Sequence, residues 1–332
     1  MGKLQEYINK YNKELAGSII KLSDSPYNGI ERASTGSFSC DISVGGGLPC
    51  SSIIELFGEE STGKSLLCLK TIATVQKKFD KDCVYIDLEG ALTKEWAAKV
   101  GVNPEKLYIV RPKTAEKALD TLIDLVSSRE AGVIVVDSVA SLCPIVETEE
   151  SLEKNQMGVA ARLMSKTLRV LASALQPESL TDKDKYNPCI VIFINQTREK
   201  IGVLWGNPLT TPGGKALKFY SNVRIHLKRG VHLKDSAKNI IGQNIKFTVV
   251  KNKTYKPYQV GEFSFYYDGH IDNEESIINY ALAFGLIKSK GAWCYLDNKK
   301  FQGKEAVVEY LKKDSKAILK LKKDIIDIVQ KD

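Results

Sequence analysis

The stretch GEESTGKS, residues 58–65, decides the fold, because it matches the phosphate-binding pattern G-x-x-x-x-G-K-[ST]. An apolar run, IIELF at 53–57, precedes it, and a helical pattern that begins LLCLKTIATV follows it. In such a loop the backbone N–H groups wrap a phosphate, and the dipole of the following helix favours its negative charge. A chance glycine-rich turn is the alternative, but the run before the loop and the helix after it favour a nucleotide site.

The side chains of this loop have distinct expected roles. Lys64 is expected to reach the β- and γ-phosphates, and the hydroxyl of Ser65 is expected to ligate Mg²⁺. The predicted cofactors are therefore a nucleotide and Mg²⁺. The residues expected to line the nucleotide are Glu60, Ser61, Thr62, Gly63, Lys64, Ser65 and Leu66.

Outward from the loop, apolar runs alternate with helical stretches. The runs CVYIDL, GVIVVDS and CIVIFIN are continuously apolar, as strands buried on both faces are, and VRIHL and KFTVV follow them. This alternation predicts an α/β fold with a mostly parallel, twisted sheet. The expected crossover helices are 65–79, 93–100, 115–127 and 158–175.

Three polar residues stand at the ends of these apolar runs. Asp137 is expected on the Mg²⁺ side, Glu89 is a candidate to orient the attacking water, and Gln196 is a candidate to sense the γ-phosphate. The carboxyl ends of parallel strands meet at one crevice, so we expect the three side chains to lie close together. Capping or structural roles are the alternatives for each.

The chain divides into three predicted parts. Residues 1–33 hold a short amphipathic helix and a lone strand at 18–22, which together bury little and call for a partner subunit. Residues 34–271 form the α/β core, in which 176–188 reads as an exposed surface loop. Residues 272–332 form a small basic α+β domain.

Composition excludes several classes of protein. With 332 residues, 43% hydrophobic and 27% charged, the chain is neither disordered nor a small disulfide-stapled domain. Its seven cysteines form no C-x-x-C pair, which favours reduced core thiols. No run is long and apolar enough for a membrane span, and the polar start differs from a signal peptide, so a soluble cytoplasmic protein is expected. A net charge of +8 permits an anionic partner such as nucleic acid.

Eight motifs occur along the chain: STGS (34–37), GEESTGKS (58–65), YIDLEGAL (85–92), VIVVDSVASL (133–142), MGVAARLMS (157–165), FINQTREKIGVLWGNP (193–208), TPGGKALKFY (211–220) and VVKNKTYKP (249–257). Together they resemble the motifs of the bacterial and phage RecA-type recombinases, in the same order and at similar spacing. The resemblance implies a RecA-type ATPase core with an N-terminal polymerisation element. It also implies a helical filament that uses ATP and Mg²⁺, binds single-stranded DNA, pairs it with a homologous duplex and exchanges strands in recombinational DNA repair and the SOS response.

Residue by residue, the resemblance assigns two groups of site residues. Lys64, Glu89 and Gln196 act in hydrolysis, and Lys251 and Lys253 match lysines that reach a neighbouring subunit's ATP. For the adenine, the matching aromatic residues are Trp96 and Tyr267. The DNA-binding residues implied are Met157, Arg162, Ser165, Arg169, Arg198, Lys200, Ile201, Gly202, Gly213 and Gly214.

Two other functions stay open at this point. One is a RecA-fold mediator that binds ATP without exchanging strands, and the other is a filament that acts as a regulatory scaffold. The candidate partners, besides single-stranded and duplex DNA, are a LexA-like repressor and single-strand-binding or loader proteins; no membrane partner is expected. The motif FINQ and the paired lysines favour the recombinase over the mediator.

Overall fold

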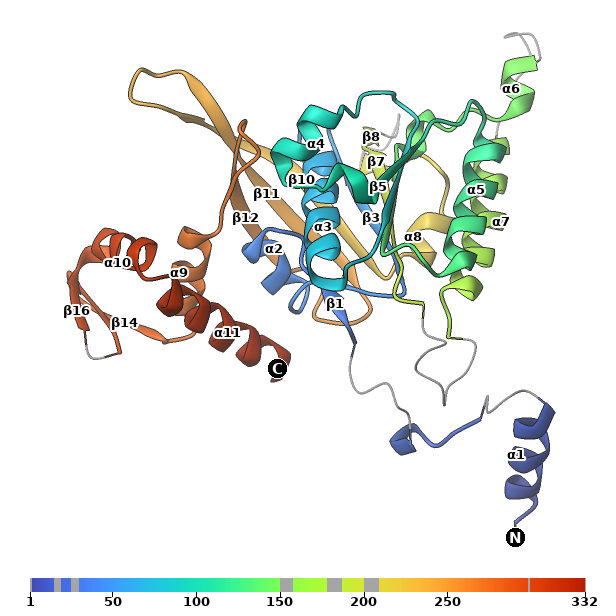
Figure 1. Cartoon of the computed structure of the whole chain (residues 1–332), viewed down its shortest axis with the longest axis horizontal. Helices are drawn as coiled ribbons and strands as arrows, with labels where there is room; N and C mark the ends of the chain where they lie inside the picture. Colours follow the sequence, from blue (N-terminus) through green and yellow to red (C-terminus); the bar gives the residue numbers. More distant parts are fainter. Residues whose placement is uncertain are drawn as a thin grey trace.

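A nine-stranded sheet forms the centre of the computed structural model (Figure 1). Its strand order is β13-β12-β11-β10-β3-β7-β6-β4-β5. The six strands from β10 to β5 are parallel, whereas β10 to β13 pair antiparallel. The structure describes residues 2–14, 19–24, 30–149, 158–177, 187–199, 209–297 and 299–331.

The predicted apolar runs form strands of the core sheet, and the structure contains further strands that were not predicted. The strands are β1 Arg32–Ala33, β2 Leu48–Pro49, β3 Ser52–Gly58, β4 Cys83–Asp87, β5 Leu107–Val110, β6 Val133–Asp137, β7 Ile190–Gln196, β8 Arg198–Glu199, β9 Leu209–Thr210, β10 Val223–Lys234, β11 Ile240–Asn252, β12 Val260–Tyr266, β13 Ile271–Asp272, β14 Ile287–Lys290, β15 Trp293–Leu296 and β16 Lys299–Gln302. The mostly parallel α/β class predicted from the sequence is confirmed.

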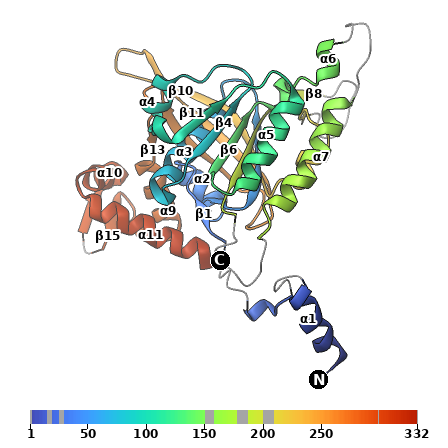
Figure 2. The same ribbon diagram turned by 45° about the vertical axis from the view of Figure 1, so that its right-hand side comes forward.

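Helices cover both faces of the sheet (Figures 1 and 2). Leu67 of α3 and Val100 of α4 join one buried cluster, while Leu122 of α5 and Leu168 of α7 join the cluster on the opposite face. The α-helices are α1 Lys3–Glu14, α2 Phe38–Ser43, α3 Lys64–Phe79, α4 Lys94–Val100, α5 Ala115–Ser128, α6 Ile145–Glu149, α7 Val159–Ala174, α8 Ala216–Tyr220, α9 Glu274–Ala283, α10 Gly303–Lys313 and α11 Ser315–Lys331, and the 3-10 turns are η1 Leu22–Asp24, η2 Pro104–Lys106 and η3 Val139–Ser141.

Successive residues of one strand point to opposite faces, which is why the central strands are apolar throughout. In β3, Ile54 belongs to the cluster under α3, and Ile53 belongs to the cluster under α5 and α7. The loops at the carboxyl ends of these strands therefore rest on a sheet that is packed on both sides.

The C-terminal part has its own small sheet and core. Strands β14, β15 and β16 pair antiparallel, and α9, α10 and α11 pack with them around buried residues such as Ile278, Leu311 and Ile325. Phe38 and Ile42 of α2 join the same cluster and connect it to the rest of the chain. Figure 1 shows this part beside the main sheet, on the side of α2.

The N-terminal helix is amphipathic, as expected, but the strand predicted at 18–22 is not present in the described residues. Residues 19–21 are irregular, and a 3-10 turn begins at Leu22. A strand needs a partner strand for its backbone N–H and C=O groups. The described part of this single chain offers no such strand at 19–22, and the side chain of Asn12 pairs instead with the N–H and the carbonyl oxygen of Ile19, each at 2.8 Å. Helix α1 stands away from the sheet in both views (Figures 1 and 2), and Leu4 and Tyr7 on it are exposed.

The loop predicted at 176–188 is not exposed along its whole length. Residues 178–186 lie outside the described residues, but Asn187 is fully buried rather than exposed. Its Nδ2 donates to the carbonyl oxygens of Val126, at 2.9 Å, and Ala174, at 3.1 Å. The amide satisfies two helix carbonyls, so a polar residue is buried here without an unpaired group.

None of the helices in the described part of the chain combines the length and apolar character that crossing a bilayer requires.

The seven cysteines are all free, and six of them are buried. Burial raises the pKa of the Cys83 thiol to about 12, and the thiolate is the reactive form. At pH 8 we therefore expect a thiol reagent to label about one cysteine in the native chain, Cys143, and all seven after denaturation. The Cys143→Ser variant should show almost no native labelling; rapid labelling of two or more native thiols would contradict the buried arrangement.

Candidate functional site

The loop GEESTGKS, residues 58–65, joins the end of β3 to the start of α3, as predicted. Gly63 is the N-cap of α3 and has a left-handed φ of 79°. A Cβ atom at this position would lie 2.4 Å from Cδ1 of Ile245 on β11, which is the movable end of a side chain, so it is the left-handed backbone conformation that requires glycine here. Because Gly63 has no side chain to cap the helix, the first N–H groups of α3 are open to an anion.

Lys64 lies over the loop with its ammonium group facing inward. Its Nζ donates to the carbonyl oxygens of Gly58, at 3.1 Å, and Glu59, at 2.5 Å. Burial lowers the pKa of Lys64, and the nearby carboxylates of Asp137 and Glu89 oppose that shift. The site therefore holds a desolvated cation where the sequence predicts the phosphates.

Asp137 ends β6 beside the loop. Its Oδ2 accepts hydrogen bonds from the Ser65 hydroxyl, at 2.9 Å, and the Tyr85 hydroxyl, at 2.5 Å. Burial raises the pKa of Asp137, while these two hydroxyls favour its ionised form. Tyr85 is fully buried in β4, and the motif YIDLEGAL, which begins with it, indicates no role for its hydroxyl.

The residues present fit a Mg²⁺ ion. No group of three or more His, Cys, Asp or Glu side chains that could hold a metal occurs among the described residues. Mg²⁺ at nucleotide sites needs no such cage, because it keeps several waters and uses one or two protein oxygens together with phosphates. Ser65 and Asp137, already in contact, supply that kind of oxygen pair.

Glu89 lies in the turn after β4, which another carboxylate shapes. Asp87 accepts hydrogen bonds from the N–H groups of Gly90, at 2.9 Å, and Ala91, at 3.2 Å. It also forms an ion pair with Arg111, 3.0 Å away. The exposed carboxylate of Glu89 is fixed at Oε1, which accepts from the hydroxyl of Ser138 at 2.8 Å.

Gln196 ends β7, and its partner in the neighbouring parallel strand is Gly58, the first residue of the loop. The N–H of Thr197 donates to the carbonyl of Gly58 at 3.3 Å. The structure thus brings Gln196, Glu89 and Asp137 to the carboxyl edge of the sheet, together with Lys64.

The two aromatic residues expected near adenine lie around one phenylalanine. Trp96 of α4 and Tyr267 each meet Phe265 edge-on, with ring centroids 6.4 and 5.8 Å away. Trp96 is partly buried, so core packing accounts for part of its surface. The N-cap of α4 is Thr93, whose side chain accepts from the N–H of Trp96 at 3.2 Å.

Strand β11 contributes a residue that sequence reasoning missed. Nε2 of Gln243 donates to the carbonyl of Ser61 at 2.7 Å, and Gln243 is buried. It fixes the middle of the loop from a strand more than 180 residues away in sequence. The sequence around Gln243 is that of an ordinary strand and gives no sign of this contact. Only the pairing of β11 with β10, which brings Gln243 beside the loop, could have indicated it.

The paired lysines lie apart from the loop of their own chain. Lys251 pairs in β11 with Arg224, which in turn pairs with Glu55, three residues before Gly58. Nζ of Lys251 donates to the carbonyl oxygens of Lys218, at 2.8 Å, and Phe219, at 2.7 Å. Burial, with Lys253 and Arg224 nearby, lowers its pKa to about 8. Lys253 is exposed.

Of the predicted DNA-binding residues, four lie outside the described residues: Met157, Lys200, Ile201 and Gly202. Arg162, Ser165 and Arg169 are on α7, and both arginines are exposed. Arg198 is exposed on β8, which pairs with β9 just before Gly213 and Gly214. A Cβ atom at Gly214 would lie 3.1 Å from that of Ala161, so the two predicted DNA segments converge beside the start of α7.

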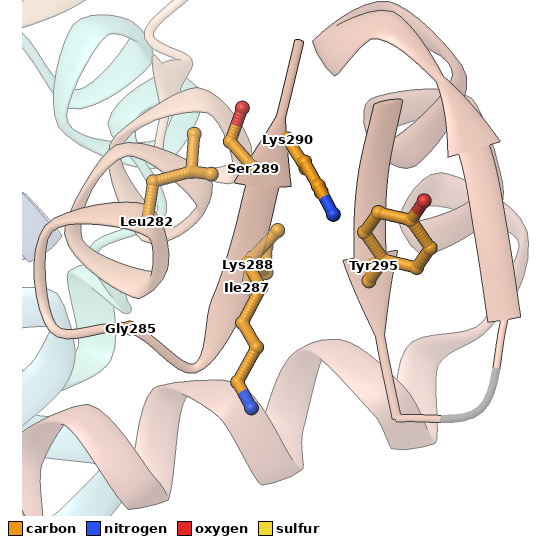
Figure 3. A pocket seen from close by; sticks show the side chains of 7 residues that line it. All are labelled: Leu282, Gly285, Ile287, Lys288, Ser289, Lys290 and Tyr295. Atoms are coloured by element: carbon orange, nitrogen blue, oxygen red, sulfur yellow. The ribbon is translucent and has the colours of Figure 1, made fainter. Parts of the chain in front are cut away.

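A separate hollow lies on the C-terminal sheet (Figure 3). It is open, with a volume of about 610 Å³, and Lys288 and Lys290 of β14 and Tyr295 of β15 are among its lining residues. An open surface of this kind is unlike the enclosed cavity that buries a small cofactor. It is distinct from the phosphate loop.

A buried ion pair supports the sheet beneath the loop. Nε of Arg224 donates to Oε2 of the fully buried Glu55 at 2.5 Å, and Nδ2 of Asn195 donates to Oε1 at 3.0 Å. Removing only the cation leaves a buried carboxylate without its counter-charge. We expect Arg224→Met to lower the free energy of unfolding by about 3–5 kcal/mol.

Denaturant unfolding of two variants checks this expectation. Glu55→Gln combined with Arg224→Met keeps an acceptor for Asn195 but removes both charges, so it should recover at least about half of the lost stability. Equal losses of unfolding free energy in the single and double variants would show that Arg224 stabilises the protein by something other than the ion pair.

The fold and this site define a P-loop ATPase with a mostly parallel sheet. The family model of the RecA N-terminal domain matches residues 3–272, and that of the RecA C-terminal domain matches residues 275–330. Protein RecA of Rickettsia massiliae is 42% identical over 298 residues, which cover 89% of this chain and 84% of that protein. Protein RecA of Teredinibacter turnerae is 40% identical over 314 residues, covering 94% and 88%.

The chain therefore belongs to the RecA family, and the resemblance drawn from its motifs is confirmed. Members of this family are DNA-dependent ATPases with recombinase activity, which use ATP with Mg²⁺, bind DNA and form filaments.

Proposed function

We propose that this chain assembles on single-stranded DNA as an ATP-dependent helical filament, pairs that strand with a homologous duplex and exchanges strands. The observation that carries the proposal is the convergence of Lys64, Glu89 and Gln196 at one sheet edge, next to the stem of the segment that holds Gly213 and Gly214. Gln196, the proposed sensor of the γ-phosphate, is followed directly by Thr197, the first residue of the proposed DNA segment. Thr197 also donates a hydrogen bond to Gly58 of the phosphate loop. A change in the bound nucleotide can therefore act directly on the DNA segment.

The chemistry proposed for the site is hydrolysis of the terminal phosphoanhydride. A water oxygen forms a bond to the γ-phosphorus while the bond to the bridging oxygen of ADP breaks, and the water's proton passes to the carboxylate of Glu89. Lys64 and the open N–H groups of α3 stabilise the negative charge on the phosphate oxygens. Mg²⁺, held by Ser65 on the side of Asp137, would neutralise further phosphate charge.

Each active site is proposed to be shared by two subunits. Within one chain, Lys251 is set back from the loop by about 10 Å along the strand direction, since three strand residues separate the positions of Glu55 and Gly58, and it lies two strands across from β3. Its ammonium group contacts the end of α8 instead. We therefore infer that Lys251 and Lys253 serve the ATP of a neighbouring subunit, and that Trp96 and Tyr267 contact the adenine.

Exposed α1 supports the same assembly. Its apolar side chains, including Leu4, Tyr7 and Tyr11, have large exposed fractions. Covering them would remove apolar surface from water, which drives association. The proposed polymerisation element at 1–33 would dock this helix on the next subunit, with residues 34–271 as the ATPase core and 272–332 as the C-terminal domain.

The test is ATP hydrolysis measured with and without single-stranded DNA, at two protein concentrations and two salt concentrations. We expect a large stimulation by DNA that rises cooperatively with protein and falls with salt, because the filament forms on a phosphate backbone. Strand exchange is then followed with a labelled duplex. Steady turnover that is indifferent to DNA would instead favour the mediator that binds ATP without exchanging strands.

A further inference from the structure

Two hydroxyl groups hold the candidate base Glu89. Oε1 of Glu89 accepts from the hydroxyl of Ser138 at 2.8 Å and from that of Ser141 at 3.4 Å. The two hydroxyls are themselves 3.1 Å apart. We name Ser138 and Ser141 the serine clamp. Glu89 is exposed, and no hydrogen bond to its Oε2 is found within the part of the chain that the structure describes.

The serine clamp belongs to one short element. Ser138 is the N-cap of η3, and Ser141 is its last residue. Between them stands Val139, which is buried. A shift of η3 therefore moves both hydroxyls together, and with them the carboxylate they hold.

The element η3 also touches the proposed DNA segment. A Cβ atom at Gly213 would lie 2.8 Å from Cγ1 of Val139, so the backbone of Gly213 rests directly on this side chain. Gly214, the next residue, faces Ala161 of α7 instead. Contiguous packing thus runs from the backbone of Gly213 through Val139 to the serine clamp and Glu89.

We propose that Ser138 and Ser141 are positioning residues for the hydrolytic base, and that Gly213 sets their place through Val139. This inference rests on the proposed DNA-dependent hydrolysis and names how DNA regulates it. Movement of Gly213 when DNA binds is transmitted to η3, because a packed contact of this kind cannot absorb the shift. Oε2 of Glu89 is then aimed at the attacking water while Oε1 stays in the serine clamp.

The first test concerns the serine clamp itself. Ser141→Ala should lower kcat for DNA-stimulated hydrolysis roughly threefold to tenfold with an unchanged KM for ATP, since orientation of the base affects the transition state rather than binding. Ser141→Thr keeps the hydroxyl and should restore kcat. An unchanged kcat in Ser141→Ala, or equal losses in the alanine and threonine variants, would overturn the positioning role.

The second test concerns the contact with Gly213. Gly213→Ala and Gly214→Ala both place a side chain at positive φ, 86° and 77°, so backbone strain is common to the two. Only the Gly213 variant presses on Val139. Adding Val139→Ala removes the clashing Cγ1 atom, and it should raise DNA-stimulated kcat about fivefold or more in the Gly213→Ala background but not in the Gly214→Ala background.

The outcomes separate this inference from the proposed function. If the unmodified chain shows no stimulation by DNA, the proposed function fails and this regulation fails with it. If the unmodified chain is stimulated, but Val139→Ala has the same effect in both glycine backgrounds, only the route through Val139 is overturned. Binding of labelled single-stranded DNA, measured in parallel, distinguishes a loss of coupling from a loss of DNA affinity.

Discussion

ATP turnover should fall at least about 100-fold when Lys64 is replaced by alanine, because a preorganised cation at a dry phosphate site contributes to the transition state on this scale. The ammonium group of Lys64 is buried and reaches the carbonyl oxygens of Gly58 and Glu59 across the loop. The phosphates would take the place of these carbonyl oxygens as its partners. Steady-state hydrolysis with saturating single-stranded DNA measures the loss.

A matched control for Lys64→Ala lies on the same helix. Lys77→Ala removes an exposed lysine from the far end of α3, so it should leave turnover within about twofold of the unmodified chain. Thermal unfolding of both variants establishes that the fold is kept. Retention of more than a tenth of the turnover in Lys64→Ala would contradict the assigned phosphate site.

Two inactive variants should recover activity when they are mixed. Lys251→Ala and Glu89→Ala are each expected to lose hydrolysis, the first because a neighbour's site lacks its cation and the second because the site lacks its base. In a random equimolar filament, about one quarter of the interfaces pair an intact Glu89 with an intact Lys251, so turnover should return to about that fraction.

The proposed sharing of each site between two subunits can be tested sharply by mixing. Turnover is measured over a series of ratios at constant total protein, and it should be greatest near equal amounts. A mixture of Lys64→Ala with Glu89→Ala is the control, since both residues lie on the same side of the interface and no interface regains a complete site. Absence of recovery at every ratio would count against a shared active site.

The phosphate site was predictable because its residues lie close in sequence to strand ends. Lys64 and Ser65 follow one apolar run, and Asp137, Glu89 and Gln196 follow others, so strand polarity alone places them at one edge. Their convergence needed no knowledge of side-chain contacts. Strand polarity gives no such prediction for a side chain whose position is set by contacts with residues far away in sequence.

The contacts that escaped prediction are those set by tertiary structure. Tyr85 and Gln243 sit inside strands, where an aromatic residue or an amide reads as ordinary strand composition, yet they bond Asp137 and Ser61. Strand β5 was missed because Tyr108 and Ile109 are exposed at the sheet edge and make no continuous buried run. Strand β12 was missed in the same way, since its residues alternate in burial.

Two local interpretations failed for opposite reasons. Residues 18–22 have the composition of a strand, but a strand exists only with a partner strand, and the described part of one chain provides none there. Asn187 looked like part of a polar loop, but its amide is buried because two helix carbonyls required a donor. The composition of a segment is compatible with several conformations and degrees of burial, and the hydrogen-bond partners available in the fold select among them.

The burial of the thiols protects this protein from oxidation of its cysteines. Peroxides attack cysteine as the solvent-accessible thiolate, and six of the seven sulfurs are shielded from solvent. Cys143 alone stands partly open, on the stretch between η3 and α6. A repair protein built this way keeps its sheet and nucleotide loop chemically inert to the same oxidants that damage the DNA on which it acts.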